Sequence, residues 1–411
     1  MTNYFVRNRT SDTPARTPPL SVHGELAHFI CGKELRTEDV MKMSRRKGRR
    51  YRRQLKRLKK KQERCNSLGG FEEVFNFHDL YKAGKKCCNG VRWKQSVQQF
   101  ELRLFSGTAA RRRALVNGKY KFAPYTHFML RERGKTRPID APKIQDRQVE
   151  KVYTQRVLLP LYLPGMIHNN GASLPGKGFH FSQKMLIRDL HRHFRKYGRK
   201  GGIILADAKK FFPNADHDFI FERHRKIIFD KRLRDFGDAV VETVETGMPL
   251  GVEPSQAEMI AYPSQLDNYF SAQMRLTGGH YMDDFYFLVP PGCDYKKVIA
   301  LLHEQAGKNK FVLNPGKTRY ISLKKPFRFC KAKYFLTESG HVVKRANKNS
   351  MPRNRKKLKS LYKKLRAGKI GIENILASLN GMVAYLENYD EHKNILRLRR
   401  KDNVLRYAEK I

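Results

Sequence analysis

Two neighbouring aspartates lie in the middle of an otherwise apolar segment. Asp283 and Asp284 stand between Tyr281 and Phe285, within residues 280–289, which read as two short buried strands. A buried carboxylate without a partner costs several kcal/mol, so something must offset the desolvation. A tight turn between the strands lets both side chains reach one site, and a divalent metal ion is the natural partner. The alternative is that the two acids form an ordinary turn dipeptide.

A third acid ends another apolar run. The residues from Ile203 to Ala206 form a wholly apolar stretch that leads into Asp207, and the turn residues Pro213 and Asn214 follow. Magnesium prefers oxygen ligands and usually shares them with substrate phosphates, which explains carboxylates in place of His or Cys. The pattern therefore predicts a carboxylate metal site that handles phosphates.

Seven blocks of the chain, in order, resemble the motifs of reverse transcriptases. They are residues 137–147, 170–178, 205–217, 247–256, 281–284, 313–318 and 327–340. The resemblance extends over residues 70–410. It implies an α+β fold of the right-hand polymerase type, with fingers, an RRM-like antiparallel palm sheet, a helical thumb and a basic N-terminal extension. Within that family, the group it resembles is bacterial: the phage-borne and defence-associated "unknown group" enzymes or those of diversity-generating retroelements.

The resemblance assigns the catalytic and metal-binding residues. Two Mg²⁺ ions, with Mn²⁺ as the alternative, would be held by Asp207, Asp283 and, less directly, Asp284, and the carbonyl of Ala208 would complete one shell. One ion would activate the primer 3′-hydroxyl and the other would stabilise the leaving pyrophosphate. Lys317 would neutralise or protonate that pyrophosphate; the alternative is that it belongs to a plain surface turn.

The same resemblance predicts the nucleotide-binding residues. The planar guanidinium of Arg137 would clamp the triphosphate, assisted by Arg131 and Lys135, which are otherwise only part of a solvated hairpin. Phe212 would exclude ribonucleotides by occupying the space of a 2′-hydroxyl, unless it is simply a core residue.

The loop before the catalytic turn departs from the pattern of many relatives. Leu250, followed by Gly251, replaces a glutamine, and Gln256 replaces a proline. An apolar side chain at this nucleotide-binding position cannot hydrogen-bond the nucleotide or template, which puts ordinary copying fidelity in doubt. Residues 261–269 and 334–340 favour the "unknown group" over the diversity-generating enzymes.

Charge predicts the class of partner. Lys and Arg number 85 against 38 Asp and Glu, a formal net charge of +47. Such an excess requires a polyanion, and nucleic acid fits better than a membrane because no apolar run reaches the roughly 18 residues of a membrane span. The six cysteines match neither a disulfide framework nor a zinc site, which favours free thiols in the cytoplasm.

Periodicity predicts the elements that hold these residues. We expect a strand pair over residues 125–139, a βαβ-like core from residue 203, a helix over 295–306 and a hairpin over 327–343 turned at Ser339 and Gly340. The predicted regions are a basic extension (1–66), fingers with the start of the palm (67–202), a palm with catalytic aspartates and primer grip (203–343) and a basic helical thumb (344–411).

Two basic segments are predicted to bind RNA. Thirteen of the twenty residues 45–64 are Lys or Arg, with Tyr51, Leu55 and Leu58 spaced for one helix face; the alternative is a disordered charged tail. The last 60 residues combine apolar stripes with basic faces, and residues 1–23 read as a flexible lead-in. The predicted RNA-binding residues are Arg45, Arg46, Arg49, Arg50, Arg52, Arg53, Lys356, Lys357 and Lys363.

The function predicted is RNA-directed DNA synthesis. A structured non-coding RNA would be the template, dNTPs the substrates and cDNA the product, with no membrane partner and with a homo-oligomer or accessory protein as further options. The biological role favoured is anti-phage defence. The alternatives are a low-fidelity diversity-generating enzyme, a template-independent nucleotide adder, an RNA-directed RNA polymerase and an RNA-binding scaffold with an inactive palm.

Overall fold

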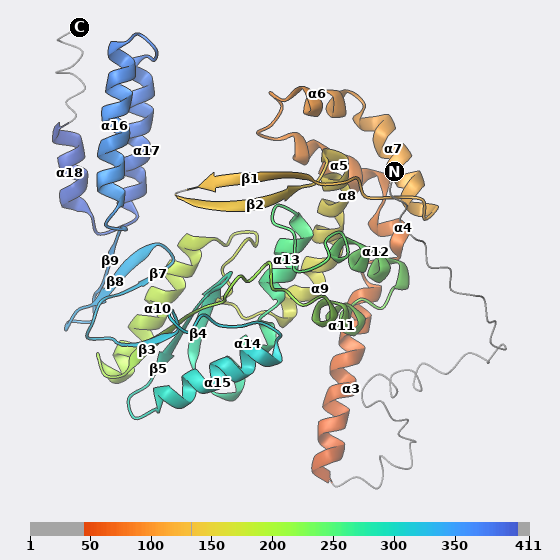
Figure 1. The fold of residues 1–411 in the computed structure, drawn as a ribbon. Helices are drawn as coiled ribbons and strands as arrows, with labels where there is room; N and C mark the ends of the chain where they lie inside the picture. The colour runs from red at the N-terminus through yellow and green to blue at the C-terminus, as the bar shows by residue number, and fades with distance from the viewer. Residues whose placement is uncertain (1–44, 133, 402–411) are drawn as a thin grey trace. The chain divides into compact units, whose positions relative to one another are not determined.

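The computed structural model describes residues 45–132 and 134–401 and divides the chain into two units, Met1–Ser67 and Leu68–Ile411. In the first unit the described part is one long helix, α3 (Arg45–Asn66), shown in Figure 1. The helix predicted for residues 45–64 is therefore confirmed, whereas the expected lead-in, residues 1–23, lies outside the described residues. None of the described helices has the length and apolar character needed to cross a bilayer.

A four-stranded antiparallel sheet lies at the centre of the second unit. Its strands are β3 (Gly202–Asp207), β4 (Thr277–Tyr281), β5 (Asp284–Val289) and β6 (Arg319–Ser322), in the order β4-β5-β3-β6. The predicted strand ending on Asp207 and the predicted strand pair around Asp283 and Asp284 are confirmed. The expected βαβ-like core takes the split form, because each crossover passes over one intervening antiparallel strand.

Both faces of this sheet are covered, which explains why its two central strands, β3 and β5, are mostly apolar. Ile204 and Phe287 face a core that includes α15 (Tyr295–Lys308), and Ile203 and Leu288 face a second core that includes α10 (Phe179–Tyr197). The helix predicted over residues 295–306 is α15, and its N-terminus is capped by Asp294, whose carboxylate accepts from two backbone N–H groups.

Helices fill the crossover between β3 and β4. They are α11 (His217–Ile227), α12 (Lys231–Val241), α13 (Glu253–Ala261), α14 (Ser264–Asn268) and the π-helix η3 (Tyr269–Gln273). Asp216 and Asp230 cap α11 and α12 by accepting hydrogen bonds from the third residue of each helix. These caps fix where the chain enters each helix after leaving the end of β3.

A mostly helical region with one two-stranded ribbon precedes the central sheet. The ribbon pairs β1 (Thr126–Glu132) with β2 (Lys135–Ala141), which confirms the strand pair predicted around the Gly134 turn (Figure 1). The helical segments are α4 (Phe71–Val74), α5 (Phe77–Cys88), α6 (Gln95–Leu102), α7 (Leu104–Val116), α8 (Ile144–Tyr153), η1 (Thr154–Leu158), α9 (Leu159–Tyr162) and η2 (Leu163–Gly165).

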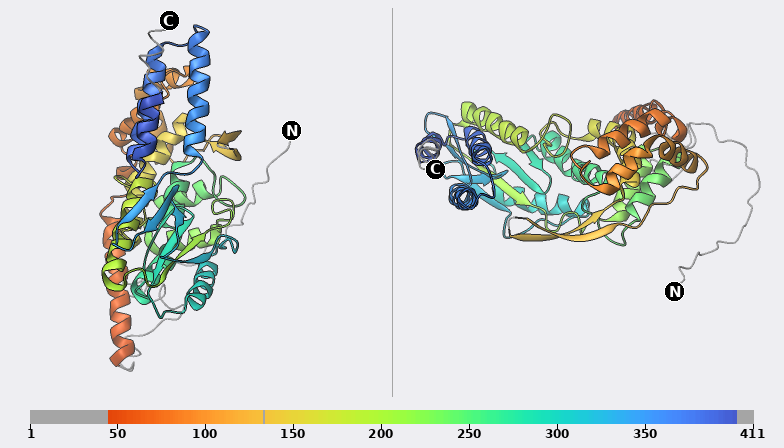
Figure 2. Two further views of the ribbon diagram at one scale, coloured as in Figure 1. Left: turned by 90° about the vertical axis from the view of Figure 1, so that its left-hand side faces the viewer. Right: turned by 90° about the horizontal axis from the view of Figure 1, so that it is seen from above.

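A small sheet and three helices follow the central sheet. The predicted hairpin is confirmed at its Ser339–Gly340 turn, which joins β8 (Ala332–Leu336) to β9 (Val342–Arg345), but a further strand, β7 (Phe327–Phe329), pairs with β8 and makes the sheet three-stranded. The additional turn is made by Cys330 and Lys331, both with positive φ, and lacks the Gly or Asn that usually marks such a turn. The helices α16 (Ser350–Arg366), α17 (Ile372–Glu387) and α18 (His392–Lys401) pack around one apolar core (Figure 2).

Candidate active site

The central sheet places Asp207 and Asp284 opposite each other. Asp207 is the last residue of β3 and Asp284 the first of β5, and the antiparallel register pairs them directly. Directly paired residues on neighbouring strands project from the same face, so the two carboxylates share one site. Burial raises the pKa of Asp284 to about 7, and the negative charges of Asp283 and Asp207 add to this effect. The sheet therefore concentrates negative charge at one end of β3 and β5.

The turn between β4 and β5 holds Asp283 beside the same strand end. Met282, the residue before it, has a left-handed backbone with φ of 54°, which is unfavourable for a residue with a side chain. The carbonyl oxygen of Asp283 accepts a hydrogen bond from the N–H of Ala208 at 2.9 Å. Ala208 follows Asp207 and is buried. Its hydrogen bond joins the end of β3 to the turn that carries the other two acids.

Lys317 reaches the same carboxylates from a distant loop. The N–H of Asn314 donates to the carbonyl of Asp207 at 2.7 Å, and the Asn314 side chain accepts from the N–H of Gly316 at 3.1 Å. This turn brings Lys317 Nζ to 2.8 Å from Asp207 Oδ2. The hydrogen bond to Asp207 raises the pKa of Lys317 and keeps it charged. The ammonium group offsets part of the negative charge at the strand ends.

The acids at this corner fit a metal ion that is shared with a substrate. Among the described residues, no group of three or more His, Cys, Asp and Glu side chains is arranged to hold a metal ion by itself. Magnesium is commonly bound by one or two carboxylates together with substrate phosphates and water, and paired Asp207 and Asp284 meet that requirement. Burial, followed by the charges of Asp283 and Asp207, raises the pKa of Asp284, and Lys317 lowers it only in part, so a further cation would stabilise the ionised carboxylate.

A cavity of about 260 Å³ opens beside these residues. Asp207, Asp284 and Lys317 line it together with three cationic residues that sequence reasoning did not single out, Arg319, Arg328 and Lys331. None of the predicted nucleotide-binding residues lines it. The cavity therefore joins the acidic corner to the turn between β7 and β8, and its basic wall suits a phosphate-bearing ligand.

The loop before α13 is fixed against both Phe212 and the β1–β2 ribbon. Gly247 has a φ of +72°, and a Cβ there would lie 2.5 Å from the carbonyl oxygen of Pro213. Gly251 has a φ of +115°, and a Cβ would come within 3.0 Å of the Asp140 carbonyl oxygen. The Leu250 carbonyl in turn accepts from the N–H of Asp140 at 2.9 Å. Packing therefore brings together predicted residues that are over 100 positions apart.

The predicted nucleotide-binding side chains are only partly assembled. Phe212 is half-buried against the core that includes α15, and Gln256 is exposed on α13. Arg131 and Arg137 are exposed but stand on opposite faces of the ribbon, because Arg131 pairs with Thr136 and Arg137 pairs with Leu130. Lys135 begins β2, and its side chain lies outside the described residues.

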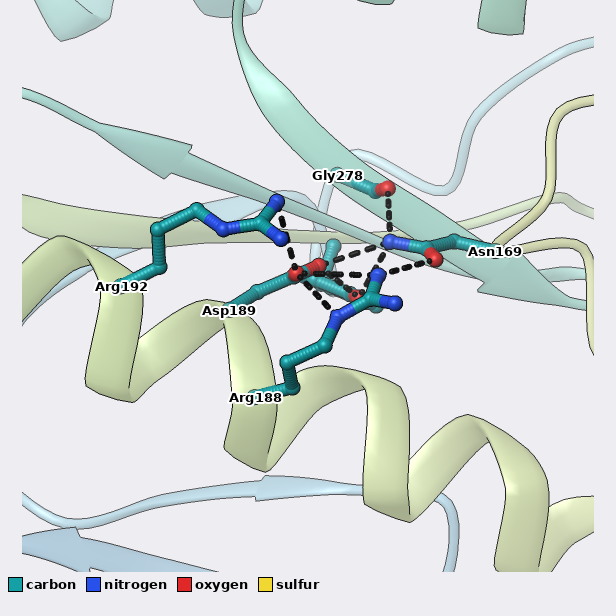
Figure 3. A network of polar contacts seen from close by, with 6 residues as sticks. Asn169, Arg188, Asp189, Arg192 and Gly278 are labelled. Carbon is teal, nitrogen blue, oxygen red and sulfur yellow. Dashed lines mark hydrogen bonds and ion pairs between the residues drawn. The ribbon is translucent and has the colours of Figure 1, made fainter.

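Buried polar residues that sequence reasoning missed support β4, the strand that leads into the turn with Asp283. Asp189 on α10 is fully buried and binds Asn169 at 2.7 Å, with Arg188 and Arg192 beside it (Figure 3). Asn169 also donates to the carbonyl of Gly278 on β4 at 3.1 Å. The signal that could have revealed such residues is a polar residue placed on the apolar face of a helix.

The predicted RNA-binding residues lie on two helices. On α3, the side chains of Arg49, Arg52 and Arg53 are exposed, whereas those of Arg45, Arg46 and Arg50 lie outside the described residues. On α16, Lys356, Lys357 and Lys363 are exposed, and Leu358 faces the core of the C-terminal helices. Exposed cations backed by an apolar face suit a polyanionic partner.

Comparison with known families identifies the class of protein. The family model described as reverse transcriptase (RNA-dependent DNA polymerase) matches residues 126–333, just over half of the chain. The chain therefore belongs to the reverse transcriptase family, and it is an RNA-directed DNA polymerase, a nucleotidyltransferase. An RNA template, dNTPs and a cDNA product follow from that activity. A search of curated proteins finds no match to the chain.

Proposed function

We propose that Asp207, Asp283 and Asp284 are the catalytic carboxylates of this reverse transcriptase and that Lys317 assists them. The observation that carries the proposal is the pairing of Asp207 with Asp284 across β3 and β5, with the Lys317 ammonium 2.8 Å from Asp207. Polymerisation needs the reacting groups to be positioned and their negative charge to be neutralised. This corner supplies acids and a cation at one point.

Two Mg²⁺ ions, or Mn²⁺ in their place, would be held by Asp207, Asp283, Asp284 and the carbonyl of Ala208. Such ions supply charge neutralisation for the attacking and leaving oxygens. Lys317 is hydrogen-bonded to Asp207 and holds a proton there. When Asp207 binds a metal ion instead, Lys317 can transfer this proton to the departing pyrophosphate. The protein thereby keeps a proton donor at the edge of the cavity before substrate arrives.

For the nucleotide, we propose a site above Phe212 between the ribbon and the loop of Leu250 and Gly251. The contact between Leu250 and Asp140 supports this, because it fixes the base of the ribbon next to the loop. Arg137 clamps the triphosphate, and Arg131, Lys135 and Gln256 contribute from the surrounding surface. Arg131 and Arg137 lie on opposite faces of the ribbon, so they do not contact the triphosphate from the same side. We assign the principal clamp to Arg137 and a secondary role to Arg131.

At the level of the whole chain, we propose a right-hand polymerase of the bacterial "unknown group". The proposed divisions are an RNA-binding extension (1–66), fingers with the start of the palm (67–202), palm (203–343) and thumb (344–411). The thirteen cations of residues 45–64 and the basic face of α16 support a structured non-coding RNA template that stays bound. Anti-phage defence is the proposed role, a homo-oligomer or accessory protein remains within the proposal, and the diversity-generating enzymes are the alternative.

The cysteines support a reducing compartment. Cys87, Cys88, Cys293 and Cys330 are free thiols, and three of these four are buried. Thiols persist where glutathione and thioredoxin keep them reduced. The proposed location is therefore the cytoplasm.

The test is to measure magnesium-dependent incorporation of dNTPs and NTPs on the RNA that copurifies from the native host. The proposal expects dNTP incorporation that depends on this RNA and yields its complement. Incorporation without a template would instead support a nucleotide adder, and preference for NTPs would support an RNA polymerase. An absence of incorporation with intact RNA binding would support the inactive scaffold.

A further inference from the structure

The catalytic turn contains an unfavourable backbone that needs support. Met282 has a φ of 54°, and its neighbours Tyr281 and Asp284 close the turn as paired residues of β4 and β5. A left-handed conformation is disfavoured for residues other than Gly, Asn and Asp, and it persists only where surrounding contacts impose it. The direction of the Asp283 and Asp284 side chains follows from this backbone. Whatever holds Met282 therefore sets the geometry of the acids.

A buried histidine makes that contact. Nδ1 of His280 lies 3.1 Å from the carbonyl oxygen of Met282, and the imidazole stacks on Phe285 with 5.1 Å between ring centres. Because a carbonyl can only accept, Nδ1 is the donor of this hydrogen bond. The His280 side chain is fully buried, so water does not compete for the bond.

An equally buried acid orients the ring from the other side. Nε2 of His280 lies 3.0 Å from Oδ2 of Asp267 on α14, and both side chains are at most 1% exposed. Burial alone would lower the pKa of His280, but the Asp267 charge and the Met282 carbonyl raise it overall. The ion pair with Asp267 on one side and the hydrogen bond to Met282 on the other restrict the ring, and together they link α14 to the catalytic turn.

The backbone of His280 is fixed as well. Its N–H donates to the Asn169 carbonyl at 3.2 Å, and its carbonyl accepts from the N–H of Gly171 at 3.1 Å. Asn169 is itself held by Asp189, so the network of Figure 3 continues into β4. His280 is thus fixed at its backbone by the Asn169–Gly171 segment and at its side chain by Asp267 and Phe285, and its Nδ1 contacts the turn.

We propose that His280 and Asp267 form a positioning pair that holds the Met282 carbonyl and thereby aims Asp283 and Asp284. The inference rests on the proposed catalytic role of those aspartates. His280 and Asp267 touch neither substrate nor the reacting atoms, so they act through the turn. Outer contacts of this kind typically change activity or metal affinity by about 10- to 100-fold when they are removed.

A second buried histidine provides a matched control. His224 on α11 lies 2.6 Å from Asp238 and 2.9 Å from Glu258, and it is as deeply buried as His280. Its contacts join α11, α12 and α13, and none of them is with the catalytic turn. His224→Gln therefore reproduces the loss of a buried His–acid pair without disturbing the turn.

The experiment compares His280→Gln, Asp267→Asn and His224→Gln in the full chain. Three quantities are measured: kcat for dNTP incorporation, the Kd for primer–template, and the rise in Tm that Mg²⁺ causes in the presence of a dNTP. The proposal expects His280→Gln and Asp267→Asn to lower kcat about 10- to 100-fold and to reduce the Mg²⁺-dependent rise in Tm, with Kd unchanged. His224→Gln should keep the wild-type kcat and the Mg²⁺-dependent rise in Tm, although it loses a similar amount of stability.

Several outcomes would overturn the proposal. If His280→Gln keeps kcat within about twofold of wild type, or if His224→Gln lowers kcat equally, the pair has only a structural role. If His280→Gln does not fold, Asp267→Asn decides by the same criteria. Should an Asp283→Ala, Asp284→Ala variant still synthesise DNA, the proposed catalytic site fails first. Should that variant be inactive while His280→Gln is normal, only the positioning inference fails.

Discussion

The acidic corner of the central sheet and the basic helices α3 and α16 place charge in opposite ways. At the corner, Asp207 and Asp284 face each other and Lys317 pairs with Asp207, so acids and a cation that offsets them in part lie side by side. On α16, Lys356, Lys357 and Lys363 are all exposed, and α3 begins with no acid in its first turn. A compact group of acids suits metal ions and chemistry on a small reacting group, whereas an extended basic surface suits a long polyanion. The comparison predicts that synthesis and RNA affinity can be disrupted separately.

The largest effect is expected from removing the acids of the corner. Replacing Asp283 and Asp284 together by Ala should lower DNA synthesis by at least about 10³-fold, because charge stabilisation at the reacting phosphate is lost. RNA affinity should stay nearly unchanged. Primer extension and filter binding on the same preparation measure the two quantities.

The control for this variant is Asp235→Ala, which removes an exposed acid on α12 that pairs with Lys231 one turn away. Surface pairs of this kind contribute little, so both activity and stability should be retained. Primer extension by the double variant would contradict the catalytic assignment.

The second-largest effect is expected on RNA binding by the basic helix α3. Deleting residues 45–64 should weaken binding of the copurifying RNA on the order of 100-fold at low salt and flatten its salt dependence by several units, since each phosphate contact contributes about 0.7 to 0.9 to the slope. Titrations at several salt concentrations measure this change. Tyr51 is the candidate for stacking on an unpaired base.

A second basic variant tests whether α16 acts in the same way. Replacing Lys356, Lys357 and Lys363 by Gln should flatten the slope by about two to three units without changing kcat at saturating template.

For the deletion of residues 45–64, an unchanged slope or recovery of only random cellular RNA would indicate that residues 45–64 are a nonspecific tail.

A smaller effect is expected at the sugar. Phe212→Ala should raise the ratio of NTP to dNTP incorporation about tenfold or more by removing a ring that collides with a 2′-hydroxyl. Phe221→Ala is the matched control, because Phe221 is also a partly buried ring packed against the same core. Equal ratios in the two variants, as measured by single-nucleotide incorporation, would mean that Phe212 is only a core residue.

The smallest effect is a pH dependence of stability. The pKa of Asp284 rises from its ordinary value near 4 to about 7 in the folded protein. The folded state therefore binds the proton more tightly, and stability is lost as the pH rises from about 4 through 7. Asp284→Asn should raise the Tm of the metal-free protein by a few degrees at pH 8 and by less at pH 5. Equal gains at both pH values would argue against the raised pKa.

Local patterns in the sequence were sufficient to predict the elements on which the site is built. The apolar run into Asp207, the acids between two strands, the ribbon around Gly134 and the helix of residues 45–64 all appear where periodicity and turn residues placed them. The turn at Cys330 and Lys331 was missed because neither residue type carries the usual signal for positive φ. The local sequence therefore determined where these strands and helices form. The exception is a turn whose unfavourable backbone is imposed by tertiary contacts.

What only the tertiary structure decided is which distant residues meet. Lys317 approaches Asp207 across 110 positions, Asp267 orients His280, and Gly251 lies against Asp140. The opposite facing of Arg131 and Arg137 likewise depends on the register of β1 and β2. A sequence pattern reports the period and turn preference of a short segment. Contacts between segments depend on how several buried faces pack at once, and that packing has no local signature.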